Sequence, residues 1–300
     1  MSKKTISITG DSGFVGTNLK YYLEDTFVIE SKSVRFVANQ SFQIQSDALI
    51  HLAGKAHDLR KISKPQEYYE ANFELTKQLF DSFLNSNCQV FVFMSTVKAA
   101  ADEVEGILTE ENKSNPKTHY GIAKRLAEEY ILSKKLPEGK RVYILRPCMI
   151  HGPGNKGNLN LLYKIVEKGL PWPLGSFENR RSFLSIENLS FVIKELLENG
   201  NIPSGIYQVA DNEPISTNEL IELIGIGIGK KNKIWKINTS IIKSISKIGD
   251  TIPFPLSTER LQKLTENYVV SNDKIIAAIG KSLPVSSKEG LLKTFKSFKY

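Results

Sequence analysis

A tyrosine and a lysine four positions apart, Tyr120 and Lys124, are the residues of this 300-residue chain whose types and spacing most directly suggest chemistry. Residues four apart lie on one face of a helix, so the phenol and the ammonium would be neighbours. Tyrosine is a poor base because its ordinary pKa is about 10, but a fixed cation favours the phenolate and lowers that pKa. The pair is therefore a candidate proton shuttle near neutral pH, although the same spacing is also common on ordinary helix surfaces.

Two hydroxyl residues, Ser95 and Thr96, directly follow an apolar run that is typical of a buried strand. Ligands of parallel sheets lie at the carboxyl edge of the strands. A hydroxyl there could hold a substrate carbonyl or alcohol oxygen within reach of Tyr120. This combination favours a catalytic role for the tyrosine over a place on the helix surface.

A glycine-rich segment lies between the first apolar run and the first helical pattern, with glycines at 10, 13 and 16. Gly10 permits a sharp turn, Gly13 lets backbone approach a pyrophosphate, and Gly16 lets helix and strand pack closely. The helix that begins near Phe14 and Val15 offers unpaired N–H groups and the positive end of its dipole to phosphates. The segment predicts a dinucleotide cofactor, NAD or NADP.

The residue that would contact the adenosine ribose leaves these two cofactors open. Glu30 is twenty positions after Gly10, at the expected end of the second strand, and an acidic residue there would bind the 2′-hydroxyl of NAD. Lys32 and Arg35 follow at once, and a cation would suit the extra phosphate of NADP. All three side chains are also compatible with ordinary surface charge.

These residues need a scaffold, and the first 150 positions predict alternating strands and helices. Strands are expected at 5–9, 27–29, 48–52, 89–94 and 141–145, and helices at 15–23, 67–84 and 120–133. Strands separated by helices imply crossover units and a parallel sheet covered on both faces, an α/β doubly wound fold. The short connection between the second and third strands lacks a helical pattern, so the sheet is expected to be trimmed there.

The remaining chain predicts a smaller region packed against the sheet. Helices are expected at 159–168 and 187–198, a strand at 206–210, and several short helices beyond. We assign residues 1–155, with returning segments at about 182–212, to a Rossmann-like NAD(P)-binding domain. Residues 156–300 are assigned mainly to substrate binding.

Composition excludes several classes of protein. With 41% hydrophobic and 24% charged residues, the chain is typical of a globular protein and not of a disordered one. No run approaches the ~20 apolar residues of a membrane span, and two cysteines make neither a disulfide framework nor a metal site by themselves. A cytoplasmic protein without an integral membrane segment or a metal is expected.

The net charge of +8 is concentrated near the C-terminus, where residues 230–300 hold 14 basic and 5 acidic side chains. Such a segment suits nucleic acid, an anionic membrane surface or simply solvated helix faces. Its lysines are scattered singly without interleaved aromatic residues, which disfavours nucleic acid. Peripheral attachment to a membrane, compatible with an enzymatic function, stays open.

Taken in order, these motifs resemble those of the extended short-chain dehydrogenase/reductases, the NAD-dependent epimerase/dehydratases that act on nucleotide sugars. The resemblance covers most of the chain. The matching segments are residues 9–16, 47–54, 71–73, 94–96, 120–124, 146–154 and 180–189.

The resemblance implies roles for individual residues. Tyr120 would be the acid/base, Lys124 would lower its pKa and bind the nicotinamide ribose, and Thr96 would hydrogen-bond the reacting sugar oxygen. Asn158 and Arg181 would contact the sugar nucleotide, with the guanidinium on the diphosphate. The cofactor would be bordered by Leu52, Ala53, Gly54, Asn72, Ser95 and Pro147, in addition to the residues of the glycine-rich loop. His51 and His151 would be structural, and a homodimer through the two long helices of the sheet domain is expected.

Departures from the family pattern narrow the reaction. Dehydratases of this type carry an Asp-Glu pair after the catalytic threonine, whereas Val97 and Lys98 follow Thr96 here. The run 95–98 and the later 154–158 are similar to bacterial reductases of UDP-4-keto-6-deoxy-N-acetylhexosamines. The expected function is therefore NAD(P)-dependent oxidoreduction at C4 of a nucleotide sugar, by a 4-epimerase or a 4-reductase, for surface polysaccharide synthesis. A non-catalytic NADP-sensing protein that keeps the fold is the alternative, although such proteins commonly lose the tyrosine or lysine.

Overall fold

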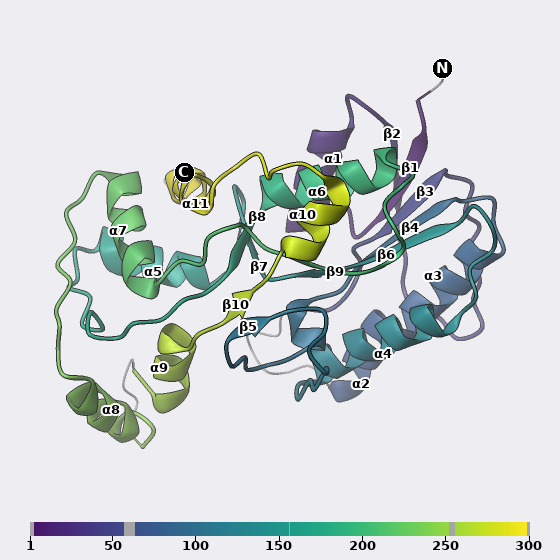
Figure 1. Cartoon of the computed structure of the whole chain (residues 1–300). Coiled ribbons are helices and arrows are strands. Elements are labelled where there is room, and N and C mark those ends of the chain that lie inside the picture. Colours follow the sequence, from purple (N-terminus) through teal and green to yellow (C-terminus); the bar gives the residue numbers. More distant parts are fainter. Residues whose placement is uncertain (1–2, 57–63, 156, 252–255, 299–300) are drawn as a thin grey trace.

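A parallel six-stranded sheet forms the centre of the molecule (Figure 1). The structure, a computed structural model, describes residues 3–56, 64–155, 157–251 and 256–298, apart from the side chain of Asn158. The strands lie in the order β2-β1-β3-β4-β6-β9, and every neighbouring pair is parallel. Their bounds are Thr5–Thr9 (β1), Val28–Lys32 (β2), Ala48–His51 (β3), Val90–Met94 (β4), Arg141–Pro147 (β6) and Gly205–Val209 (β9). The predicted doubly wound parallel sheet is confirmed.

Helices cover both faces of this sheet, as the crossover connections require. In Figure 1, α1 (Phe14–Leu23), α6 (Ile186–Glu198) and α10 (Asp273–Ile279) lie above it, with α3 (Leu75–Leu84) and α4 (His119–Ser133) below. Successive side chains of a strand point to opposite faces. In β4, Val90, Val92 and Met94 accordingly pack with α1 and α6, whereas Phe91 and Phe93 pack with α3 and α4.

The edge of the sheet differs from the expectation in one detail. The second strand is Val28–Lys32 instead of 27–29, so Glu30 lies in the middle of β2 and not at its end. In the parallel register with β1, Thr9 lies beside Lys32, which moves the ligand edge two residues beyond Glu30. No helix or strand interrupts residues 33–47, all of them described, so the sheet ends at β2 as expected.

The helix predicted over 67–84 contains an irregular turn. It comprises α2 (Pro65–Tyr69), a π-helical segment η1 (Glu70–Glu74) and α3. Such wide turns occur as single insertions in α-helices, frequently at functional sites. Asn72 lies within this turn.

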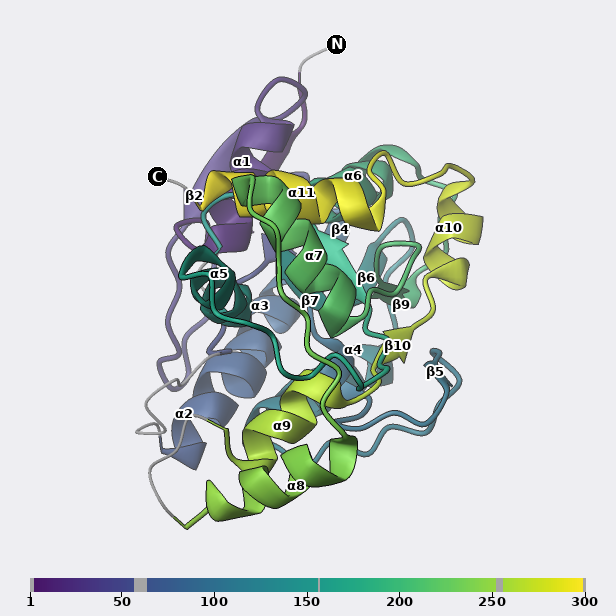
Figure 2. The same ribbon diagram turned by 90° about the vertical axis from the view of Figure 1, so that its left-hand side faces the viewer.

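The remaining elements pack beside the carboxyl edge of the sheet, where most of them build a second core (Figure 2), although Val97, Leu108 and Val270 pack in the core of the sheet. They are a 3-10 turn η2 (Val97–Ala99), β5 (Ile107–Leu108), β7 (Met149–His151), α5 (Asn158–Glu167), β8 (Phe183–Ser185), α7 (Thr217–Ile228), α8 (Thr239–Ile248), α9 (Thr258–Thr265), β10 (Val269–Val270) and α11 (Ser287–Ser297). β7 pairs with β8, and β5 with β10, outside the main sheet. Apolar side chains of α5, α7 and α11 pack together in this core.

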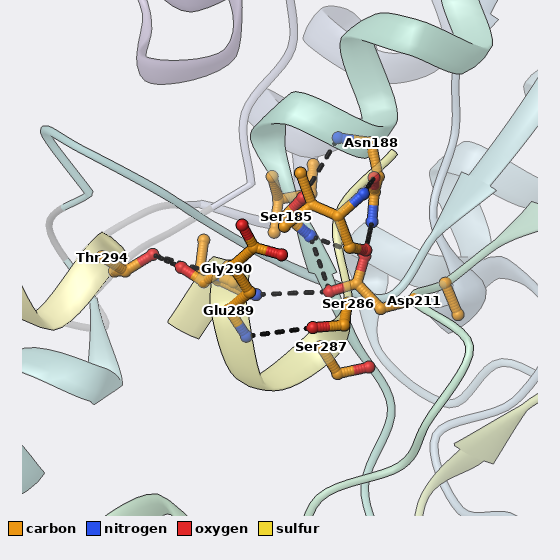
Figure 3. A network of polar contacts seen from close by, with 12 residues as sticks. Ser185, Asn188, Asp211, Ser286, Ser287, Glu289, Gly290 and Thr294 are labelled. Atoms are coloured by element: carbon orange, nitrogen blue, oxygen red, sulfur yellow. Dashed lines mark hydrogen bonds and ion pairs between the residues drawn. The ribbon is translucent and has the colours of Figure 1, made fainter. Parts of the chain in front are cut away.

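A buried polar network joins the C-terminal helix to the sheet domain (Figure 3). The Asp211 carboxylate accepts hydrogen bonds from the Ser185 backbone N–H at 3.0 Å and from Asn188 Nδ2 at 2.6 Å. His151 is fully buried, with Nδ1 2.8 Å from Thr294 Oγ1 and Nε2 3.5 Å from Asp211 Oδ2. The contact through Nδ1 fits the structural role expected of His151, whereas its buried Nε2 has no hydrogen bond among the described residues.

Candidate functional site

The loop between β1 and α1 has the backbone that the glycine pattern predicts. Gly10 has a φ of +68°, and a Cβ there would lie 2.7 Å from Ala53 N, so both the turn and the close approach favour glycine. A Cβ on Gly16 would lie 2.4 Å from Asp11 Cα, so only a glycine at this position lets α1 pack this closely against the loop. Gly13 is the N-cap of α1, so no side chain at that position covers the backbone N–H groups of the first turn, which begins at Phe14. This helix end has the groups that bind a pyrophosphate.

Ser31, and not Glu30, lies beside this loop. Its hydroxyl donates to Asp11 Oδ2 at 2.5 Å, and Lys20 Nζ reaches the same carboxylate at 3.2 Å. The hydrogen bond from Ser31 is the main reason why the pKa of Asp11 is below its ordinary value. Glu30 Oε2 instead accepts from Ser7 Oγ at 3.4 Å, and Lys32 Nζ donates to the Gln43 carbonyl. The expected strand end at Glu30 is therefore wrong, because β2 continues to Lys32, while contacts of Glu30 or Lys32 with a cofactor ribose stay predictions.

Gly54, Asn72 and Lys124 meet where β3 ends. A Cβ on Gly54 would lie 2.5 Å from Asn72 Oδ1 and 3.3 Å from Lys124 Nζ. Leu52 and Ala53 lead from β3 into this contact, with their backbone N–H groups bonded to Thr9 O and Oγ1 at 3.2 Å. Three segments that are distant in sequence thus converge at the carboxyl edge.

Asn72 is held in one orientation by the backbone of Lys55. Its Oδ1 accepts from the Lys55 N–H and its Nδ2 donates to the Lys55 carbonyl, both at 3.0 Å. The side chain is fully buried. A two-sided pairing of this kind fixes the amide orientation and anchors the π-helical turn against the end of β3.

A hydrogen-bonded chain through His51 connects the glycine-rich loop with that turn. Thr9 Oγ1 is 2.8 Å from His51 Nδ1, and His51 Nε2 is 3.0 Å from Thr76 Oγ1. The Thr76 hydroxyl donates to Asn72 O at 2.9 Å, so it accepts from a protonated Nε2, and Nδ1 accepts from Thr9. Burial lowers the pKa of His51 to about 3, with a smaller effect from Lys124. The neutral ring is therefore structural, as the sequence analysis expects.

Lys124 points into the carboxyl edge from α4. Its ammonium donates to Met94 O at 2.7 Å, lies 4.7 Å from the centre of the Phe93 ring, and is almost fully buried. Burial lowers its pKa to about 7, while the Glu128 carboxylate opposes that shift. Lys124 is thus close to its titration point at neutral pH.

Tyr120 lies one turn before this lysine on α4, and the Thr96 side chain is close enough to act on its pKa. Thr96 caps the η2 turn by accepting from Lys98 N at 3.2 Å, which leaves its own proton for Tyr120. Burial raises the pKa of Tyr120 to about 12, and the hydrogen bond from Thr96 opposes the rise. The expected lowering of this pKa is therefore wrong, because burial raises it. Lys124 is bonded to Met94 O, and burial has the larger effect on the phenol.

Arg181 lies beside the second core, where its backbone pairs with that of Ile215. It pairs with Glu266 at 3.4 Å and donates to the Lys263 carbonyl, with 19% of its side chain exposed. The ammonium of Lys98 lies 4.4 Å from the centre of the Tyr268 ring, and Arg181 is one of the charges that act on its pKa. Asn158 begins α5, and its side chain lies outside the described part of the chain. Pro147 ends β6 and is buried.

Comparison with known proteins decides the family. The model of the NAD dependent epimerase/dehydratase family matches residues 6–210, more than half of the chain. The chain belongs to this family. A UDP-glucose 4-epimerase of Vibrio cholerae is 27% identical, over 98% of this chain and 95% of that protein.

Two solved structures share the fold of this chain. RMD from Pseudomonas aeruginosa, complexed with NADPH, matches with a TM-score of 0.74 and 20% identity over 99% of this chain and 100% of its own. WbmG of Bordetella bronchiseptica, in complex with NAD and UDP, has a TM-score of 0.74 and 17% identity, over 99% and 95% of the two chains. Such likeness supports the arrangement of sheet and second core described above.

Sequence reasoning missed a buried ion pair that joins α4 to β6 beside Ser95. Glu128 accepts from Arg146 Nη2 at 2.5 Å and Nε at 2.9 Å, and both side chains are almost fully buried. Ser95 donates to the same carboxylate, so the hydroxyl expected to face the cofactor has a partner within the protein. Glu128 follows Lys124 by four positions, the spacing that could have indicated it.

The described residues contain no helix long and apolar enough to cross a membrane. A search of the same residues finds no group of three or more histidine, cysteine or acidic side chains arranged for a metal ion. A dinucleotide, by contrast, fits the geometry. The open first turn of α1 accepts phosphate, and Gly54 keeps Asn72 and Lys124 free of an intervening side chain.

Proposed function

We propose that this protein catalyses NAD(P)-dependent oxidoreduction at C4 of a nucleotide-activated sugar, as a UDP-sugar 4-epimerase or a UDP-4-keto-6-deoxy-N-acetylhexosamine 4-reductase. The observation that carries the proposal is the convergence of Thr96, Tyr120 and Lys124 at the carboxyl edge, beside the phosphate-binding turn of α1. Retention of this set argues against a protein that only senses NADP. The product would serve surface polysaccharide synthesis.

In this proposal Tyr120 moves the proton of the C4 oxygen. Bound NAD or NADP supplies the hydride acceptor or donor. The raised pKa of Tyr120 keeps the phenol protonated at neutral pH, the form in which reduction of a 4-keto group begins. In this proposal the Thr96 hydroxyl, which acts on the pKa of Tyr120, hydrogen-bonds the reacting sugar oxygen. In the oxidative direction Tyr120 must first lose its proton. A positive charge near the phenol favours this loss because it lowers the pKa of Tyr120.

Lys124 and Asn72 are proposed to hold the nicotinamide ribose. Their polar atoms converge on Gly54, and neither side chain is free to rotate, because Met94 O holds the ammonium and Lys55 backbone holds the amide. Preorganised donors of this kind lose little entropy when a ligand binds.

Arg181 is proposed to bind the diphosphate of the sugar nucleotide. A guanidinium is planar and suits bidentate contacts with phosphate. Its pairing with Glu266 at 3.4 Å is longer than a strong charge-assisted hydrogen bond, so a diphosphate can compete for the same donors. Asn158 is proposed to contact the same ligand.

The two reactions differ in what happens to the cofactor. A 4-reductase consumes one NADH or NADPH for each keto-sugar, whereas an epimerase returns the hydride to the same carbon and consumes none. We would measure absorbance at 340 nm with either reduced cofactor and a UDP-4-keto-6-deoxy-N-acetylhexosamine. Interconversion of UDP-hexoses would be followed by NMR without added reductant.

Thr96 offers a matched pair of variants for this assay. Thr96→Val removes the hydroxyl and should lower turnover about 100-fold, while Thr96→Ser should keep most of it. The proposal fails if neither substrate class turns over with NAD, NADH or NADPH present, or if Thr96→Val is as active as the natural protein.

A further inference from the structure

The segment 230–248, formed by α8 and the strand-like stretch before it, faces solvent with an unusual combination of lysine and large apolar side chains. We propose that this segment, called the α8 patch below, docks on an anionic lipid surface. Figures 1 and 2 both place α8 at the periphery of the molecule, on the far side of the second core from the sheet.

The stretch before α8 has a fixed backbone that turns a tryptophan outward. The Trp235 N–H donates to Trp172 O at 2.8 Å, and the Trp235 carbonyl accepts from Gly175 N at 3.0 Å. Ile234 and Ile237 pack against the second core, whereas Trp235 is 52% exposed. The two backbone hydrogen bonds of Trp235 therefore hold the segment in the conformation that exposes the indole side chain.

α8 is amphipathic, yet its solvent face also contains isoleucines. Ile242 and Ser246 are buried against the second core. Ile241 and Ile248, seven positions and two turns apart, form a solvent-facing ridge and are 55% and 57% exposed. Lys243 and Lys247 form a second ridge along the other border of the exposed surface, with Ser240 and Ser244 between the two ridges. A helix with exposed apolar residues next to lysines is typical of binding at a membrane interface.

The charge of the α8 patch has one sign. Residues 230–249 contain six lysines and no aspartate or glutamate. Over the described part of the chain, no carboxylate forms an ion pair with any of these six, although Lys230 donates to the Glu167 carbonyl. Other surface lysines of the same region are paired, for example Lys263 with Glu259 and Lys293 with Glu187.

The lysines and the apolar side chains of the α8 patch together indicate which kind of partner binds it. Unpaired lysines attract any polyanion, and anionic lipid headgroups attract each basic side chain near their surface. Nucleic acid would use the lysines for phosphate but offers no apolar layer for Ile241 and Ile248. A lipid interface accepts both, and tryptophan is enriched at that boundary. The patch lies outside the catalytic residues, so the inference is independent of the substrate.

The test is sedimentation of the full-length protein with vesicles of phosphatidylglycerol and phosphatidylcholine, compared with phosphatidylcholine alone. We expect binding only to the anionic vesicles, weakened when salt rises from 0.1 M to 0.5 M. Lys243→Glu/Lys247→Glu should weaken binding by at least about 30-fold, from the attraction per lysine near such a surface. Ile241→Ser/Ile248→Ser should weaken binding without changing the net charge.

A charge-matched control separates a local patch from the overall charge of the protein. Lys134→Glu/Lys135→Glu after α4 changes the net charge equally and should bind vesicles like the natural protein. The far-ultraviolet circular dichroism and melting temperature of each variant show whether it is folded. Equal losses in the two lysine pairs, no binding to anionic vesicles at 0.1 M salt, or equal binding to neutral vesicles would each overturn the proposal.

Discussion

Replacing Glu128 by glutamine tests whether its buried ion pair with Arg146 stabilises the fold. The carboxylate accepts from Ser95 and twice from Arg146, and the two charged side chains are 1% and 4% exposed. Glutamine keeps the shape but removes the charge and turns an NH₂ group toward a donor, so Arg146 stays buried without compensation. Removing one partner of a buried pair costs about 3–5 kcal/mol of the free energy of unfolding, or roughly 6–10 °C in melting temperature for a chain of this size.

A control on the same helix gives the comparison. Glu129 pairs with Arg125 at 2.7 Å, but its side chain is 51% exposed, so Glu129→Gln should cost less than about 0.5 kcal/mol. The double variant Glu128→Leu/Arg146→Met should recover part of the loss, because an apolar pair leaves no buried charge. Thermal and urea unfolding by circular dichroism measure all four proteins. An equal, small effect of Glu128→Gln and Glu129→Gln would refute the reasoning.

Two further predictions concern the lysine and the glycine beside it. Gly54→Ala places a methyl group 2.5 Å from Asn72 Oδ1 and should weaken NAD(P) binding more than tenfold in calorimetric titration; Gly200→Ala, whose methyl group meets nothing closer than 4.0 Å, should leave it unchanged. Burial lowers the pKa of Lys124 to about 7, below its unfolded value of about 10.4. Between these pH values the unfolded chain binds the additional proton, so stability rises with pH, by about 3 kcal/mol from pH 7 to 9.5. Lys124→Met should abolish that rise in urea titrations at pH 7 and 9.5; an identical rise in the variant would contradict the assignment.

Local patterns were sufficient for much of the fold and for the central residues of the site. The glycine spacing predicted the turn at Gly10, because a positive φ and a close backbone approach are local requirements. The spacing of Tyr120 and Lys124 predicted a shared helix face, and α4 has both residues. Alternating apolar runs and helical patterns predicted the parallel sheet, because these patterns are also local features of the sequence.

Contacts between distant residues could not be predicted in this way. The pair between Glu128 and Arg146 joins a helix to a strand, and Arg181 meets Glu266 across the second core. The raised pKa of Tyr120 also depends on burial, which the spacing of a tyrosine and a lysine does not determine. The π-helical turn at Asn72 escaped detection because its amide is held by backbone that lies 17 positions earlier.

The extent of β2 shows the same limit at a single position. Apolar residues predicted the strand over 27–29, but pairing with β1 continues through Ser31 and Lys32. The polar residues of that continuation give no apolar signal. The error placed Glu30 at the ligand edge, where the structure has Ser31 beside Asp11.

The central claim is that Tyr120 moves the proton of the C4 oxygen, and Tyr120→Phe tests it most directly. Turnover of the nucleotide sugar should be measured at saturating substrate, alongside calorimetric binding of NAD and NADPH. The account predicts a fall in turnover of about 100- to 10,000-fold with cofactor affinity unchanged, because the phenol oxygen is removed and Lys124, Asn72 and the loop of α1 stay in place. Turnover close to that of the natural protein would contradict it.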